Sequence, residues 1–315
     1  MKTQNDVVIE VKDLVKQYAH VTAVDDVSFE IREGEIFGMV GPNGAGKTTT
    51  IECVEGLRAP DKGRVQVLGL DPQRDGYQLR EHIGVQLQES DLPDRIKVWE
   101  ALDMFASFYA QSVDWHPLLE QLGLVDKSKA PFTKLSGGQK QRLFIALALV
   151  NDPKLVFLDE LSTGLDPKAR RTMWDLVQGI REKGKTVFLT THFMEEAERL
   201  CDRVAIMDRG KIVALDTPEN LIQSLGSENR VVFSVTEPFD ERGLQALSVV
   251  TRVEKVGERI IVFGQRDGLV SGVVNVLEDD NVQFRDLRTE QPSLEDVFLA
   301  LTGRDMQTSE EDDHA

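Results

Sequence analysis

A glycine-rich segment followed by a lysine and a threonine carries the clearest chemistry in the chain. Residues 41–49 read GPNGAGKTT and satisfy the pattern G-x-x-x-x-G-K-[ST] with Gly41, Gly46, Lys47 and Thr48. An apolar run that predicts a strand comes directly before this segment. Glycines at such a turn let backbone N–H groups point at an anion, and the helix that follows presents its positive end to the same anion. The segment therefore predicts a phosphate-binding loop.

Two side chains extend this prediction from phosphate to a nucleoside triphosphate. Lys47 supplies a compact positive charge for the terminal phosphates, and the Thr48 hydroxyl is placed to bind the accompanying Mg²⁺. The residues expected to surround the nucleotide in this loop are Gly41, Pro42, Asn43, Gly44, Ala45, Gly46, Lys47, Thr48 and Thr49.

Two carboxylates follow a second apolar run. Residues 155–158 (LVFL) are typical of a strand buried on both faces, and Asp159 and Glu160 come directly after them. Ligands of open parallel sheets bind at this end of the strands. Asp159 is then placed to hold Mg²⁺, and Glu160 to orient the attacking water or take its proton. An acidic surface turn would look the same in isolation, but the phosphate loop favours the functional interpretation.

A third segment, LSGGQ at 135–139, opens a helix-patterned stretch. Ser136 can cap that helix, and the amides of Gly137 and Gly138 lie at its positive end, so this segment also suits an anion. LSGGQ resembles the signature of the ATP-binding-cassette (ABC) ATPases. The order of phosphate loop, signature and acidic strand is also similar to that family, and the resemblance covers residues 7 to about 216.

The resemblance implies a dimer that shares its ATP. In the ABC family two cassettes assemble head to tail, and the signature of one closes on the ATP held by the phosphate loop of the other. By this resemblance, Ser136, Gly137, Gly138 and Gln139 bind the ATP of a second nucleotide-binding subunit. We expect that subunit to be another copy of this chain.

Four more positions match the family residue by residue. By the resemblance, Tyr18 stacks on the adenine ring, and His192 contacts the terminal phosphate. Gln88 matches the glutamine that reaches Mg²⁺ and the attacking water, and Gln86 is a second glutamine two positions earlier. Asp166 matches the loop that communicates across the dimer.

Composition and charge narrow the class of protein. The chain has 315 residues, of which 41% are hydrophobic, so it is long enough for a large core. A net charge of -17 argues against a broad nucleic-acid surface, and we expect no nucleic-acid partner.

The longest apolar run, 143–150, is far shorter than the roughly 20 residues of a membrane span, and the N-terminus has no signal-peptide core. Cys53 and Cys201 lack metal-site spacing and are expected to be reduced, partly buried thiols.

The pattern along the chain indicates an α/β fold, with a P-loop NTPase (RecA-like) core. An ABC ATP-binding domain is expected at 7–217, with an antiparallel β subdomain and an inserted helical subdomain at about 89–134. Residues 219–304 read as a small α+β accessory domain. Its expected elements are strands at 230–236, 259–264 and 282–288, a helix at 268–277, and a capped helix that starts at 292–296. Residues 305–315, DMQTSEEDDHA, are expected to be a disordered acidic tail.

The end of the accessory domain refines the family. Its sequence PSLEDVFLALTGRD resembles that of the ATPase subunits of bacterial ABC exporters of the drug-resistance and sodium-extrusion type, whose membrane-spanning subunits are separate chains. The resemblance implies ATP hydrolysis that powers export, by a peripheral subunit at the cytoplasmic face of the membrane. It also implies that the helical subdomain contacts the membrane subunit just after Gln88, with Trp99 a candidate for that contact.

Other functions for an ABC ATPase fit the sequence less well. A ribosome-associated factor usually carries two cassettes, and this chain has one phosphate loop and one LSGGQ. A chromosome-maintenance ATPase would insert a long heptad-patterned arm between those motifs. A soluble ABC ATPase with a regulatory or ribosome-associated role remains as the alternative.

Overall fold

The computed structural model describes residues 6–87, 91–225, 228–235, 240–265 and 268–304. The chain divides into two compact units, the first ending at Pro218 and the second covering Glu219–Arg304. No helix in these described ranges is both long and apolar enough to cross a membrane. The predicted Gln88 and the predicted tail at 305–315 lie outside the described residues.

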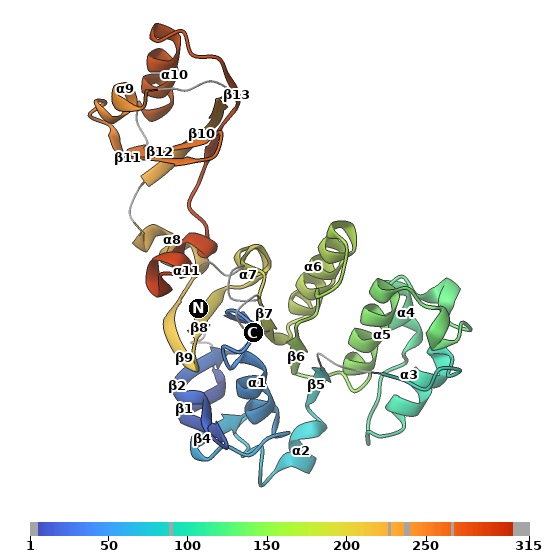
Figure 1. The fold of residues 1–315 in the computed structure, drawn as a ribbon. Helices are drawn as coiled ribbons and strands as arrows, with labels where there is room; N and C mark the ends of the chain where they lie inside the picture. The colour runs from blue at the N-terminus through green and yellow to red at the C-terminus, as the bar shows by residue number, and fades with distance from the viewer. Residues whose placement is uncertain (1–5, 88–90, 226–227, 236–239, 266–267, 305–315) are drawn as a thin grey trace, which may run out of the picture. The chain divides into compact units, whose positions relative to one another are not determined.

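A six-stranded sheet forms the centre of the first unit, in the order β5-β6-β7-β3-β8-β9 (Figure 1). All neighbouring pairs are parallel except β8 and β9. The strands are β3 (Ile36–Val40), β5 (Ile83–Gln86), β6 (Leu155–Asp159), β7 (Thr186–Thr191), β8 (Arg203–Asp208) and β9 (Lys211–Asp216). Every residue of β3, β6 and β7 is buried, as their apolar runs predict.

A three-stranded antiparallel sheet, β2-β1-β4, packs against this centre. Its strands are β1 (Val7–Tyr18), β2 (Val21–Arg32) and β4 (Lys62–Val67). Phe29 of this sheet stacks on Phe37 of β3, with ring centroids 5.4 Å apart, and both rings meet the edge of Phe188 from β7. This aromatic cluster lies in a core shared by the two sheets.

Helices complete the first unit. Helix α1 contacts strands of both sheets, α5 contacts β5, and α6 and α7 contact each other and β7. Beyond β5, α3 and α4 contact α5 (Figure 1). We call residues 98–134, from α3 to η2, the helical segment. The helices are α1 (Lys47–Glu55), α2 (Gly76–Arg80), α3 (Val98–Ala106), α4 (His116–Gln121), η1 (Val125–Lys127), η2 (Phe132–Lys134), α5 (Gly137–Leu149), α6 (Pro167–Glu182) and α7 (Met194–Leu200).

The second unit has a four-stranded antiparallel sheet in the order β11-β12-β10-β13. Its elements are α8 (Pro218–Ser224), β10 (Glu228–Val235), α9 (Arg242–Gln245), β11 (Val250–Val256), β12 (Arg259–Gln265), α10 (Leu269–Asp279), β13 (Phe284–Glu290) and α11 (Leu294–Thr302). From β10 to β13 the elements follow the β-α-β-β-α-β arrangement of ferredoxin-like folds. Residues of β10, β12 and α10 form its core.

The predicted fold class is confirmed, whereas the boundaries of the proposed domains stay a prediction. The expected helix start near Pro292 is present as α11, whose capping box joins Ser293 and Asp296. Strand β11 was not expected, because its sequence VTRVEKV carries three charged residues in seven positions. The sequence also did not predict the short helix α9.

The contact between β5 and α5 generates a test of the packing. A Cβ atom at Gly84 would lie 1.9 Å from the Ala148 carbonyl oxygen, so Gly84→Ala must push α5 away from the sheet. We expect a loss of about 1–3 kcal/mol of stability. At Gly179, inside α6, the nearest atom is 3.9 Å away, and Gly179→Ala should raise stability by up to about 1 kcal/mol. Urea-unfolding midpoints measure both; equal midpoints for the two variants would contradict this packing.

Candidate functional site

The predicted phosphate loop connects β3 to α1 as the sequence indicates. Helix α1 begins at Lys47, and Gly46 before it has a left-handed backbone with φ 101°. A side chain at Gly46 would also place its Cβ 2.3 Å from the Ala23 carbonyl oxygen. Only glycine suits both conditions. The first turn of α1 therefore directs its backbone N–H groups into the loop, where they suit an anion.

Lys47 is held by the loop and by Glu160. Its Nζ atom donates hydrogen bonds of 2.8 Å and 3.0 Å to the carbonyl oxygens of Gly41 and Pro42. It also lies 3.3 Å from Glu160 Oε1, and both side chains are buried. Burial lowers the pKa of Lys47, and the charge of Glu160 opposes that change. The ammonium group is thus fixed by three oxygen atoms at the end of the loop.

Glu160 is the centre of this buried cluster. Its Oε2 atom lies 2.6 Å from His192 Nδ1 and accepts a 2.9 Å hydrogen bond from the Thr163 hydroxyl. Burial alone would raise the pKa of Glu160, but the hydrogen bond with His192 and the charge of Lys47 outweigh it and bring the pKa to about 2. Glu160 is therefore a carboxylate at neutral pH.

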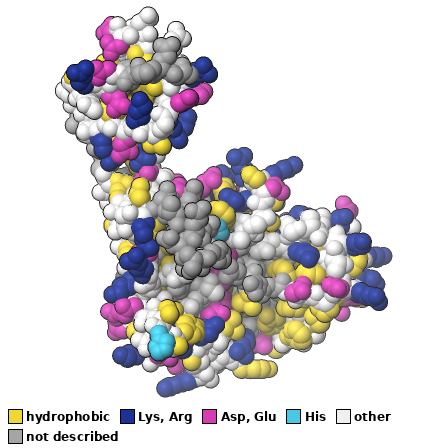
Figure 2. Space-filling view, viewed as in Figure 1, with side chains coloured by type: hydrophobic (Ala, Val, Ile, Leu, Met, Phe, Trp, Pro, Cys, Tyr) yellow, Lys and Arg dark blue, Asp and Glu magenta, His cyan; other side chains and the backbone are white. Residues whose placement is uncertain are grey.

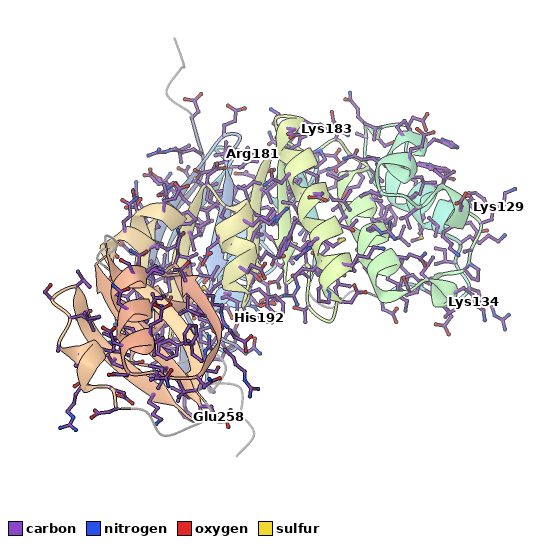
Figure 3. The ribbon with its side chains drawn as sticks, turned by 90° about the horizontal axis from the view of Figure 1, so that it is seen from above. Lys129, Lys134, Arg181, Lys183, His192 and Glu258 are labelled. Atoms are coloured by element: carbon purple, nitrogen blue, oxygen red, sulfur yellow. The ribbon has the colours of Figure 1, made fainter. Side chains whose placement is uncertain are left out.

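The backbone around Glu160 explains how β6 and β7 bring the cluster together. Glu160 has a left-handed φ of 54°, a conformation that costs energy in a residue with a side chain. Its N–H donates a 3.1 Å hydrogen bond to the Thr190 carbonyl oxygen on β7. Two residues after Thr190, the chain reaches His192 (labelled in Figure 3). The strained turn therefore aims Glu160 at the end of the neighbouring strand.

Asp159 is buried beside this cluster and has the donors that a hard cation prefers. The Thr190 hydroxyl donates to its carboxylate, and the Thr48 hydroxyl is also hydrogen-bonded to it. Burial raises the pKa of Asp159, and these hydrogen bonds oppose that effect. A carboxylate and a hydroxyl at the phosphate loop fit the oxygen ligands of Mg²⁺.

The LSGGQ segment starts α5 with a complete capping box. The Ser136 N–H donates to Gln139 Oε1 at 2.9 Å, and the Gln139 N–H donates to Ser136 Oγ. A cavity of about 290 Å³ lies beside this helix start, and its walls include Gly137 and Gly138. Asp166 lies on the same cavity and caps α6 through two 2.9 Å hydrogen bonds. Among the described residues, the lining of this cavity includes none from the phosphate loop.

Two other predicted positions are Tyr18 and Gln88. Tyr18 ends β1 and is 37% exposed, and the cationic groups of Lys16 and Arg58 lie 5.7 Å and 5.2 Å from its ring centroid. Gln88 lies outside the described residues. Gln86 is buried, and its amide donates to the Leu87 carbonyl oxygen at 2.6 Å.

Comparison with protein families and curated proteins gives consistent matches. Residues 24–163 match the family described as ABC transporter. The chain is 39% identical to the Nod factor export ATP-binding protein I of Paraburkholderia xenovorans, over 95% of this chain and 98% of that protein. It is 37% identical to the protein of the same name from Rhizobium etli, over 95% and 94%.

Solved structures agree in fold. An ATP-binding subunit of an ABC transporter superposes with a TM-score of 0.63 at 29% identity, over 70% of this chain and 93% of that one. A dimeric ATP-binding cassette in a post-hydrolysis state with ADP and Pi superposes with a TM-score of 0.60 at 26% identity, over 66% and 98%.

Sequence reasoning missed Glu55, a second carboxyl group close to Asp159. Glu55 is 3% exposed on α1, and neither of its oxygens has a hydrogen-bond partner among the described residues. Burial raises its pKa well above the usual value, and the nearby charge of Asp159 adds to this. The available signal was spacing, because Glu55 follows Ile51 by four residues and so shares its buried helix face.

This burial makes Glu55→Gln a test of the site's electrostatics. A folded-state pKa above the unfolded value means that the carboxyl lowers stability as pH rises past its unfolded pKa of about 4.3. The stability of Glu55→Gln relative to the unmodified chain should therefore increase from about pH 5 to pH 8, by up to about 1.4 kcal/mol per pH unit. Urea unfolding at several pH values measures it. An equal stability difference between the two chains at pH 5 and pH 8 would contradict a buried Glu55 carboxyl without a hydrogen-bond partner.

Proposed function

Because the chain belongs to the ABC transporter family of ATP-binding proteins, we propose that it powers export through separate membrane-spanning subunits, at the cytoplasmic face of the membrane. The chain is an ATPase of this family. The observation that carries the proposal for its mechanism is the buried cluster of Lys47, Glu160 and His192 directly behind the phosphate loop.

In the proposed mechanism the loop binds ATP through its backbone N–H groups and Lys47. The terminal phosphates attract the Lys47 ammonium, and this attraction competes with its ion pair to Glu160. As the phosphates draw the charge of Lys47 away from Glu160, the pKa of Glu160 rises from its low value. Nucleotide binding thereby makes Glu160 a better base.

Glu160 then takes a proton from the water that attacks the terminal phosphate, or orients that water. His192, 2.6 Å from Glu160, keeps the carboxylate in place and reaches the same phosphate. Thr48 and Asp159 would hold Mg²⁺, with Gln88 as the proposed third ligand, and the ion would there neutralise charge on the phosphates. Tyr18 offers its partly exposed ring to the adenine, as a planar aromatic face allows.

We infer that the LSGGQ segment acts on the ATP of a second copy of the chain. The N-terminus of α5 opens on its own cavity of about 290 Å³, which the phosphate loop does not line in the described part of the chain. This helix end is suited to an anion, and an ATP held by the phosphate loop of a second subunit would supply that anion. Ser136, Gly137, Gly138 and Gln139 would contact that ATP, with Asp166 beside them.

The contact with the membrane subunit is proposed for the helical segment. Helix α3 and the residues after it leave three large apolar side chains exposed, Trp99, Met104 and Phe108, the last by 64%. Figure 2 shows hydrophobic side chains gathered over this segment. Lys129 and Lys134 project from the same segment (Figure 3). An exposed apolar cluster rimmed by charge is typical of a protein-protein contact.

Glu160→Gln tests the catalytic assignment. It removes the carboxylate but keeps the shape of the side chain, so ATP binding should persist while kcat falls by about a hundredfold or more. The variant should accumulate as an ATP-bound dimer in size-exclusion chromatography. The exposed Glu195→Gln on α7 is the matched control and should behave as the unmodified chain. Hydrolysis by Glu160→Gln at the unmodified rate would refute the role of Glu160.

Complementation tests the head-to-tail dimer. Ser136→Arg and Lys47→Ala should each abolish ATPase activity in homodimers. In a mixed dimer, one site carries both substitutions and the other carries neither, so one intact site should restore activity. Two affinity tags isolate the mixed dimers before the assay. Assembled mixed dimers without activity would argue against shared sites.

Phe108→Asp tests the membrane contact. It places a charge among the exposed apolar side chains, so a membrane subunit that co-purifies with the unmodified chain from native membranes should no longer do so. ATPase activity of the isolated chain should stay unchanged, because Phe108 is exposed and follows α3, which carries none of the proposed phosphate-handling residues. Leu57→Asp, at another exposed apolar side chain, is the control and should retain the partner. Loss of the partner in both variants would remove the support for this surface.

A further inference from the structure

A cavity of about 260 Å³ lies in the second unit, away from its two-helix core. Core residues such as Val231 and Val262 face α10, so their neighbours Arg230 and Phe263 face the opposite side of the sheet. That side forms one wall of the cavity. Helix α11 forms another wall, which includes the side chain of Leu299.

The sheet wall is a row of three paired residues. Arg252 of β11 pairs in register with Phe263 of β12, and Phe263 pairs with Arg230 of β10. The guanidinium carbons of Arg252 and Arg230 lie 3.9 Å and 5.1 Å from the centroid of the Phe263 ring. Two cations therefore flank one aromatic ring on the cavity wall.

The two arginines differ in their ion-pair partners and in their exposure to solvent. Arg230 Nη2 forms a 2.7 Å ion pair with Asp296, whose carboxylate also accepts two hydrogen bonds from Ser293. Arg230 Nε is buried and has no acceptor among the residues that the structure describes. Arg252 is about half exposed and forms a 3.2 Å ion pair with Glu254. Arg252 thus offers an accessible guanidinium to an anionic oxygen, whereas Arg230 is held by Asp296.

We propose that this cavity binds a small organic carboxylate that carries an apolar group. A planar carboxylate matches the donor geometry of the Arg252 guanidinium, which lines the cavity against the Phe263 ring. Leu225 and Leu299 offer apolar walls to the rest of the ligand, beside the Phe263 ring. The volume suits a molecule of roughly amino-acid size, since pockets for drug-sized ligands begin at about 300 Å³. This site is independent of the ATPase mechanism proposed above.

Four probes test the ligand class on the full chain by ligand-observed NMR. Phenylacetate has both features of the proposed ligand, 2-phenylethanol lacks the charge, acetate lacks the ring, and phenyl phosphate replaces the carboxylate. We expect phenylacetate to bind at least tenfold more tightly than 2-phenylethanol and acetate. No binding of phenylacetate at about 10 mM, or equal binding of 2-phenylethanol, would overturn the proposal. Tighter binding of phenyl phosphate than of phenylacetate would also overturn it, in favour of a phosphate ester.

Two variants locate the binding. Arg252→Gln removes an exposed cation and should weaken phenylacetate binding about tenfold, the usual effect of one hydrogen bond to a charged group. Arg259→Gln is the matched control, because Arg259 is a half-exposed arginine of β12 that pairs with Glu290 and does not line the cavity. It should bind phenylacetate within twofold of the unmodified chain. Equal weakening by both variants would overturn the site.

Ala300→Leu supplies a test that leaves the charge unchanged. Ala300 lines the cavity on an exposed part of α11, so a larger apolar side chain occupies ligand volume without disturbing a core position. Binding of phenylacetate should fall at least tenfold while the melting temperature stays the same. Unchanged binding in this folded variant would place the ligand elsewhere and refute the proposal.

Discussion

The buried ion pair of Lys47 and Glu160, with His192 hydrogen-bonded to Glu160, is the constraint on which the first unit depends. Charges removed from water are stable only when their partners are held at short distance. The loop after β3 holds Lys47, the end of β6 holds Glu160, and the end of β7 holds His192. These three strands are adjacent in the order β6-β7-β3, so the parallel sheet fixes the distances on which the cluster relies. The strained backbone of Glu160 is tolerated because its N–H is bonded to the neighbouring strand.

The sequence predicted the residues of this cluster, but it did not predict the contacts between them. Uninterrupted apolar runs before Gly41 and Asp159 identified two buried strands, and the polar residues that end them marked the same edge of the sheet. Burial raises the pKa of Glu160, whereas His192 and Lys47 lower it. The balance depends on distances across three strands, which no local sequence pattern encodes. Glu55 was missed because one charged residue in a short helix reads as surface. Strand β11 was missed because its charges hide the alternation that a half-buried strand would show.

The second unit uses the same chemical groups differently. Its sheet has one face closed by α9 and α10, so that face contributes packing alone. The other face carries Phe263 between two arginines: Arg230 is ion-paired with Asp296 of α11, and the more exposed Arg252 with Glu254 of β11. None of the residues proposed to handle phosphate lies in this unit, since all of them precede Pro218. A chain of this kind can therefore change its accessory chemistry without altering the distances that ATP hydrolysis requires.

The burial of both cysteines has a consequence for the chain under oxidising conditions. Burial raises the pKa of Cys53 to about 11 and that of Cys201 well above its usual value. Cys201 also packs so closely against Gly38 that a Cβ atom there would lie 2.5 Å from its sulfur. Peroxide attacks the thiolate and not the thiol, and it needs access to the sulfur atom. The folded chain thus shields both sulfur atoms from peroxide, and we expect its two cysteines to react much more slowly than exposed thiols.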